Sequence, residues 1–235
     1  MMLKAKLNDW NAILSVLGSV VKEVTITTDG EKASCMAVDP SHVLFVKCSI
    51  ACEGQVPTFT VSADQMQKAL TAAGGKEPEI EFNQEKGILR VIGNAKVNLP
   101  LISYDDEVTV KDISAQGMYA NPDTVSEYAP SELDPLITYG TYSKEQECVF
   151  SAKDGKLSIT VGSGQKQSEI ECGTVTGNGA VVKCSLDYMS LINKHAKSTD
   201  KVDVLMPGDS MPILFKWITG DSAQMVVLLA PWIEE

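Results

Sequence analysis

Arginine and histidine are scarce in this chain of 235 residues, where Arg90 is the one arginine and His42 and His195 are the two histidines. The guanidinium group is the side chain that best reads guanine edges, so its near absence argues against sequence-specific DNA recognition. The net charge is −11. Because phosphate neutralisation requires cations, any contact with nucleic acid must use segregated, sequence-independent lysine contacts.

Catalytic and metal-binding patterns are also missing. The chain has no HExxH, no GxSxG and no phosphate-binding glycine loop, the patterns of zinc proteases, serine hydrolases and nucleotide-binding enzymes. The acidic run Asp105-Asp106-Glu107 could hold a metal, but its polar surroundings indicate a solvated linker. We therefore expect a non-enzymatic protein with no cofactor and no bound metal.

The six cysteines are scattered without a CxxC pair, and several lie in apolar, strand-like runs. This distribution indicates reduced core residues rather than disulfides or a zinc site. The cysteines are Cys35, Cys48, Cys52, Cys148, Cys172 and Cys184.

Long hydrophobic runs and a signal sequence are absent as well. The longest uncharged apolar run, Met225 to Ile233, is too short to span a bilayer, and the start of the chain lacks the basic and apolar regions of a signal peptide. The sequence therefore predicts an intracellular protein, in the cytoplasm or nucleoid of a prokaryotic-type cell. Its length allows two domains, each with its own core.

Alternation of apolar and polar residues with a period of two dominates much of the chain. Val24 to Thr27 and Glu79 to Phe82 alternate in this way, which is typical of half-buried strands. Turn dipeptides such as Asp29-Gly30 and Asp154-Gly155 separate such runs. We therefore expect mainly antiparallel sheet.

Four segments show helical spacing instead. Asn8 is predicted to cap the first helix, and Ser62 and Ser185 to open the second and fourth. Asn121-Pro122 is predicted to start the third helix, which Pro130 would stop. The predicted buried faces are Trp10, Ile13, Leu14, Leu17 and Val21 in the first helix, Met66, Ala69 and Leu70 in the second, Val125, Tyr128 and Ala129 in the third, and Met189, Ile192 and His195 or Ala196 in the fourth.

These segments recur in the same order along the chain. The matching pairs are Thr58 to Leu70 with Val181 to Asn193, Asn98 to Ile102 with Leu229 to Ile233, and Cys35 to Ala37 with Cys148 to Phe150. The shifts between matches differ, so their common order is what indicates a repeat. The chain is predicted to hold two copies of one strand-rich, two-helix domain, residues 1–102 and 116–235, joined by a connecting loop at 103–115.

Two runs resemble a known family. Ala37 to Val46 reads AVDPSHVLFV and Leu229 to Glu235 reads LAPWIEE, similar to the DxSHV segment and the LAPxIEE ending of proliferating cell nuclear antigen (PCNA) clamps. The chain is identified as a member of this family of DNA sliding clamps, most similar to its archaeal form, although the resemblance is faint from about Gly117 to Gly179. It implies an α+β clamp fold in which each domain carries two helices on antiparallel sheets.

The resemblance also implies a function. Three subunits would close into a ring, with twelve helices lining a hole for double-stranded DNA, and the homotrimer would act as a sequence-independent processivity factor. Its partners would be DNA polymerase, the clamp loader and other replication and repair proteins that carry PCNA-interacting peptides. A subunit of a heterotrimeric or checkpoint-type clamp, and a mobile-element or viral processivity factor, remain open as alternatives.

The family comparison implies three sets of site residues. The partner-peptide pocket would contain Val38, Ser41, His42, Val43, Phe45, Pro212, Ala230, Pro231, Trp232 and Ile233, beside the connecting loop. The DNA-facing lysines would be Lys22, Lys68, Lys76, Lys194, Lys197 and Lys201. The subunit interface would pair an edge strand with Lys96, Val97, Leu99 and Leu101 against a second edge strand with Glu169, Ile170 and Glu171.

One region departs from the family pattern. Clamps usually carry basic residues on the third helix, but residues 121–137 contain no lysine or arginine. The acidic residues there are Asp123, Glu127, Glu132 and Asp134. Either the other three helices hold the DNA, or this clamp is specialised.

Overall fold

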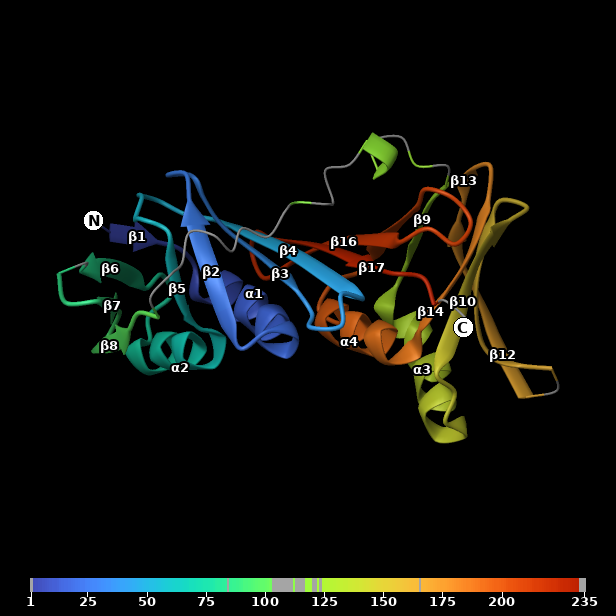
Figure 1. The fold of residues 1–235 in the computed structure, drawn as a ribbon, viewed down its shortest axis with the longest axis horizontal. Helices are drawn as coiled ribbons and strands as arrows, with labels where there is room; N and C mark the ends of the chain where they lie inside the picture. Colours follow the sequence, from blue (N-terminus) through green and yellow to red (C-terminus); the bar gives the residue numbers. More distant parts are fainter. Residues whose placement is uncertain are drawn as a thin grey trace. The chain divides into compact units, whose positions relative to one another are not determined.

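The chain forms two compact units in a computed structural model (Figure 1). The first comprises Met1–Asp112 and Ile218–Met225, and the second comprises Ile113–Trp217 and Val226–Glu235. The structure describes residues 2–83, 85–102, 112, 117–119, 122, 124–164 and 166–232. Within these ranges, no helix has both the length and the apolar character needed to cross a membrane.

The first unit contains two helices and eight strands that form antiparallel layers. One sheet has the strand order β1-β6-β7-β8, and the other strands follow the order β4-β3-β2-β5. Helices α1 and α2 pack against each other (Figure 1). The elements are β1 (Met2–Lys4), α1 (Leu7–Val20), β2 (Glu23–Thr28), β3 (Lys32–Val38), β4 (Leu44–Ala51), β5 (Phe59–Ser62), α2 (Ala63–Ala73), β6 (Glu79–Asn83), β7 (Ile88–Ile92) and β8 (Lys96–Pro100).

The second unit repeats this arrangement. Its strands follow the orders β14-β10-β11-β12 and β9-β15-β16-β17, with the short β13 beside β9, and α3 packs against α4. The elements are η1 (Gly117–Tyr119), β9 (Thr124–Tyr128), α3 (Pro130–Ser143), β10 (Glu147–Lys153), β11 (Lys156–Ser163), β12 (Lys166–Thr174), β13 (Thr176–Gly177), β14 (Ala180–Ser185), α4 (Leu186–Ala196), β15 (Val202–Met206), β16 (Ile213–Thr219) and β17 (Ala223–Leu229).

The helices show the duplication most clearly. Helices α1 and α3 both have 14 residues, α2 and α4 both have 11, and in each pair the first residues are 123 positions apart, 7 with 130 and 63 with 186. The predicted match of Thr58 to Leu70 with Val181 to Asn193 therefore joins equivalent elements. Met66 and Met189 occupy the same position in α2 and α4, and both are buried.

One of the predicted sequence matches is wrong. Cys35 lies in β3, whereas Cys148 lies in β10. Strand β10 pairs with β11 and β14, just as β2 pairs with β3 and β5. The counterpart of β10 is therefore β2, and the Cys35 and Cys148 runs were aligned only because both are short, buried strands of similar composition.

The first helix begins two residues earlier than predicted. Lys6, in an extended conformation, occupies the N-cap position, so Asn8 lies inside α1 and does not cap it. Trp10, Ile13, Leu14 and Leu17 are buried as predicted, while Val21 lies beyond the end of the helix. The apolar periodicity therefore located the helix correctly.

The predicted third helix is a strand followed by a helix. Residues 124–128 form β9, in which Thr124, Ser126 and Tyr128 are buried and Val125 is 40% exposed. Pro130 begins α3 instead of ending a helix, because proline suits the first helical position, where its missing N–H costs nothing. The sequence of β9 carries no apolar alternation that predicts a strand, because Thr124 and Ser126 are buried and Val125 is exposed.

The cysteines lie largely in the core, as predicted. Five of the six are buried, and Cys52 is half-buried. Burial raises the pKa of the thiols of Cys35 and Cys172 to about 12. These thiols are therefore packing residues with little thiolate character.

Candidate DNA and partner surfaces

The six lysines predicted to face DNA lie on or beside α1, α2 and α4, and all are exposed. Lys22 follows α1, and Lys76 follows α2. Lys194 lies in the last turn of α4, whose C-cap is Lys197. The helices thus place these side chains at the surface, as their spacing predicted.

Three of these lysines are paired with carboxylates. The Nζ–O distances are 2.7 Å for Lys68 with Asp64, 3.0 Å for Lys197 with Asp134, and 2.6 Å for Lys201 with Glu127. The hydrogen bond and the negative charge of Glu127 raise the pKa of Lys201. Sequence reasoning noted the acidic residues near α3 but missed their pairs with Lys197 and Lys201, since these join residues far apart in the chain.

Helix α3 itself carries no cation. Its residues Pro130–Ser143 include Glu132 and Asp134 but no lysine or arginine. Glu132 accepts a hydrogen bond from the backbone N–H of Ala129 at 2.9 Å, which satisfies a free donor at the helix start. The departure from the family pattern therefore persists once the boundaries of the helix are corrected.

Strand β8 lies at an edge of its sheet and pairs with β7 alone among the described strands. Lys96 and Asn98 are exposed on one face, and Val97 is half-buried on the other. Leu99 was predicted to reach a subunit interface, but its side chain is only 4% exposed. It belongs to the core of the first unit, because β8 packs against α2.

Strand β12 is an edge strand of the second unit and pairs with β11. Glu169 and Glu171 are exposed on its outer face, and Ile170 is half-buried on the inner face. Glu171 lies 2.6 Å from Lys156 Nζ. The β12 edge is thus acidic where the β8 edge carries Lys96.

The turn between β3 and β4 is built around Asp39, which is 5% exposed. Its carboxylate accepts hydrogen bonds from the backbone N–H groups of Ser41 at 3.0 Å and Val43 at 2.7 Å. His42 adopts a left-handed conformation, with a φ of 57°. Ser41 and His42 are exposed, whereas Phe45 is 3% exposed and packs in the core.

Val38, at the end of β3, is half-buried, and the remaining predicted pocket residues belong to the second unit. Pro212, Ala230 and Pro231 are half-buried, and Trp232 is 39% exposed. The backbone N–H of Trp232 donates to the carbonyl oxygen of Lys183 at 2.7 Å. Ile233 and the predicted connecting loop, except Asp112, lie outside the described residues.

Tyr119 is a neighbour of Pro212 that sequence reasoning missed. Its hydroxyl donates to the Pro212 carbonyl oxygen at 3.2 Å, and burial raises its pKa to about 12. Met118 and Met211, next to this pair in the chain, are each 37% exposed. The contact between Tyr119 and Pro212 was not visible in the sequence, because the two residues are far apart in the chain.

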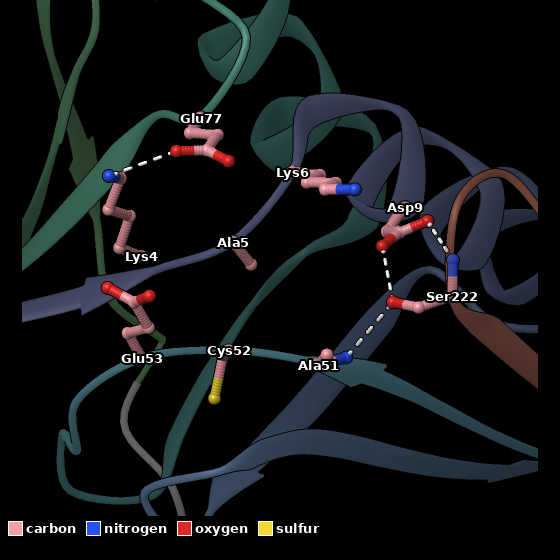
Figure 2. A pocket seen from close by; sticks show the side chains of 9 residues that line it. All are labelled: Lys4, Ala5, Lys6, Asp9, Ala51, Cys52, Glu53, Glu77 and Ser222. Atoms are coloured by element: carbon pink, nitrogen blue, oxygen red, sulfur yellow. Dashed lines mark hydrogen bonds and ion pairs between the residues drawn. The ribbon is translucent and has the colours of Figure 1, made fainter.

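A cavity of about 230 Å³ in the first unit is a further candidate site (Figure 2). Asp9, fully buried, accepts hydrogen bonds from the backbone N–H groups of Asp221 and Ser222 and from the Ser222 hydroxyl, at 2.6 to 2.9 Å. Lys4 pairs with Glu77 at 3.0 Å. The polar groups of this cavity therefore bind one another, an arrangement that supports folding.

The cavity also lacks an activated nucleophile. Cys52 lines it, but burial and the negative charge of Asp29 raise the pKa of this thiol. Within the described ranges, no group of three or more His, Cys, Asp or Glu residues could hold a metal ion. The acidic run at 105–107 lies outside those ranges.

No protein-family model matches the chain. It is nevertheless similar over almost its full length to archaeal proteins. The DNA polymerase sliding clamp of Methanococcus vannielii is 22% identical, covering 99% of this chain and 100% of that protein. The DNA polymerase sliding clamp of Nitrosopumilus maritimus is 21% identical over 97% of this chain and 96% of its own length.

Solved structures share the fold. A PCNA2–PCNA3 complex from Sulfolobus tokodaii has a TM-score of 0.77 at 19% identity, and A. fulgidus PCNA bound to the C-terminal region of FEN-1 has a TM-score of 0.82 at 18% identity. Both comparisons cover 100% of each chain. This chain therefore has the DNA-clamp fold.

Fold and full-length sequence similarity point to the same proteins. The chain is similar over almost its full length to archaeal DNA polymerase sliding clamps, and it shares the fold of the solved PCNA structures. The α+β fold expected from the resemblance is confirmed, with four helices on antiparallel sheets.

Proposed function

We propose that three copies of this chain close into a ring around duplex DNA and tether DNA polymerase and other replication and repair enzymes as a processivity factor. The observation that carries this proposal is the duplicated two-helix unit, which presents a different edge strand from each copy. A closed ring holds DNA by topology, so it slides without needing strong or sequence-specific contacts. Tethering raises the local concentration of a bound polymerase, to roughly the millimolar range for a short tether.

The charges of the two edges support closure by identical subunits. Lys96 on β8 is basic, whereas Glu169 and Glu171 on β12 are acidic. A head-to-tail contact between these edges would bring opposite charges together on the outer face of a continuous sheet. Repeated around a three-fold axis, this contact satisfies each exposed strand edge.

The turn at Asp39 is the proposed docking surface for partner peptides. Asp39 holds the turn from within, so Ser41, His42 and Val43 are presented in a fixed conformation. Preorganisation of this kind lowers the entropy lost on binding. The complex of A. fulgidus PCNA with the C-terminal region of FEN-1 supports a short peptide as the ligand.

Charge variants test the ring. The wild-type chain is expected to have the mass of three subunits by light scattering. Lys96→Glu, or Glu169→Lys with Glu171→Lys, should shift the mass towards one subunit because like charges would then meet. A chain carrying all three changes should recover the ring, since its edges are complementary again.

The variant Val43→Glu tests the proposed peptide-binding surface at the Asp39 turn. It should keep the mass of the ring and lose binding of a labelled FEN-1 C-terminal peptide.

With an archaeal clamp loader and ATP, the wild-type ring should be retained on nicked circular DNA and released when that DNA is cut. A chain that reaches ring mass only with a different clamp chain contradicts the homotrimer and favours a heteromeric clamp.

A further inference from the structure

Asp134 holds Lys197 from a fixed position in α3. Its Oδ2 atom lies 3.0 Å from Lys197 Nζ, and its Oδ1 atom accepts a hydrogen bond from Asn193 Nδ2 at 2.9 Å. Asn193 is fully buried in α4, and its amide nitrogen also donates to the Pro130 carbonyl oxygen at 3.1 Å. A buried amide thus orients the carboxylate, while the lysine extends from the exposed end of α4.

A second lysine after α4 is also paired with an acid. Glu127 on β9 lies 2.6 Å from Nζ of Lys201, which follows α4. Both lysines that follow α4 are therefore bound by acids from β9 or α3. These acids are two of the four that distinguish residues 121–137 from the usual clamp pattern.

The first unit has no equivalent of this arrangement. At the shift of 123 residues, Asn11 occupies the position of Asp134, Leu70 that of Asn193, and Gly74 that of Lys197. Lys68 does pair with Asp64, but within one helix, with 75% and 68% of the two side chains exposed. Lys22 and Lys76 have no ion pair with another described residue.

We infer that Asp134 and Glu127 shield Lys197 and Lys201 from DNA phosphates, so that the first unit supplies most of the electrostatic contact with DNA. This inference rests on the proposed function, in which the helix lysines face the duplex. A phosphate approaching Lys197 must displace a carboxylate that Asn193 keeps in place. The acids of the second unit thereby weaken the hold of the ring on DNA and favour sliding.

Asp134→Asn tests this shielding with little structural change. The new side-chain oxygen still accepts the hydrogen bond from Asn193, and only the charge is lost. Binding to a short labelled duplex, measured by fluorescence anisotropy across a salt series, should become about 2- to 5-fold tighter at low salt. The slope of log K against log salt should steepen by up to about 0.9, because one more phosphate is neutralised. Adding Glu127→Gln should steepen the slope again by a similar amount.

Glu147→Gln is the matched control. Glu147 pairs with Lys183 at 3.3 Å between β10 and β14, on the sheet face opposite the buried Cys148 and Cys184, and the variant changes the net charge by the same amount. Its salt slope should equal that of the wild type. In a Lys197→Met background, the effect of Asp134→Asn should vanish.

Three results would overturn the inference. Equal slopes for the wild type and Asp134→Asn would show that Lys197 is not shielded, and equal gains for Asp134→Asn and Glu147→Gln would show an effect of net charge alone. Wild-type protein without salt-dependent DNA binding would refute the DNA contact in the proposed function itself, and the shielding with it.

Discussion

The third residue of the first helix in each unit is a carboxylate, and the two carboxylates act differently. Glu132 in α3 is exposed and accepts a hydrogen bond from the backbone N–H at the start of its own helix. Asp9 in α1 is fully buried and binds the turn at Asp221 and Ser222, which lie 212 and 213 residues further along the chain. The same position in a repeat therefore serves local capping in one copy and a long-range contact in the other.

Helix packing differs between the copies in a similar way. The one glycine of α1, Gly18, is exposed, and a Cβ built on it would lie 3.5 Å from Ala63 Cβ, an ordinary contact. In α3 the glycine is Gly140, which is buried, and a Cβ there would lie 2.3 Å from Leu186 and 2.7 Å from Val161. Leu186 stands where α2 has Ala63, so the larger side chain in α4 requires a glycine in α3.

The largest difference should appear when the two carboxylates are removed. Asp9→Ala leaves two backbone N–H groups and the Ser222 hydroxyl without their acceptor, and we expect it to lower the free energy of unfolding by about 3 kcal/mol or more. Glu132→Ala removes only an exposed cap, at a cost of about 0.3–1.5 kcal/mol. Urea unfolding of the two variants measures both losses. Equal losses would contradict the long-range role of Asp9.

Replacing the two glycines by alanine should change the stability of the protein in opposite directions. Gly140→Ala forces α3 away from Leu186 and Val161, and overpacking of this kind costs about 1–3 kcal/mol. Gly18→Ala has room for the methyl group and should stabilise α1 by up to about 1 kcal/mol through helix propensity. Thermal unfolding compares the pair, and a stabilised Gly140→Ala would show that the packing of α3 on α4 adjusts freely.

The smallest effect concerns pH and His195, whose counterpart in α2 is Ala72. Burial, and then the positive charge of Lys194, lowers the pKa of His195. The unfolded chain therefore takes up the proton first as pH falls below about 6.5, and the unfolding free energy decreases down to the lower pKa of the folded state. Between about pH 6.5 and the pKa of the folded state, the free energy of unfolding should decrease less for His195→Ala than for the wild type, as measured by urea unfolding at several pH values. Parallel pH profiles would contradict a depressed pKa.

Much of the fold was predictable from local patterns. The spacing of Met66, Ala69 and Leu70 located α2, and Ser62 begins it by accepting a hydrogen bond from the backbone N–H of Gln65 at 3.4 Å. The same spacing in α4 revealed the repeat. Such signals work because capping and amphipathic burial act within a few residues of each other.

The candidate sites were only partly predictable. The exposed lysines beside α2 and α4 and the turn at Ser41 and His42 lie at the surface as expected. Phe45 and Leu99 were placed at binding surfaces but lie in the core. A sequence run shows which residues are apolar, but whether an apolar side chain points to the core or to a partner depends on which strands and helices cover it.

The sequence by itself determined the duplication, the surface lysines and the scarcity of arginine that excludes base reading, because composition and periodicity are properties of the chain. The tertiary structure alone decided that Asp9 binds a distant turn and that Asp134 and Glu127 neutralise Lys197 and Lys201. These contacts join residues far apart in sequence, which no local pattern encodes.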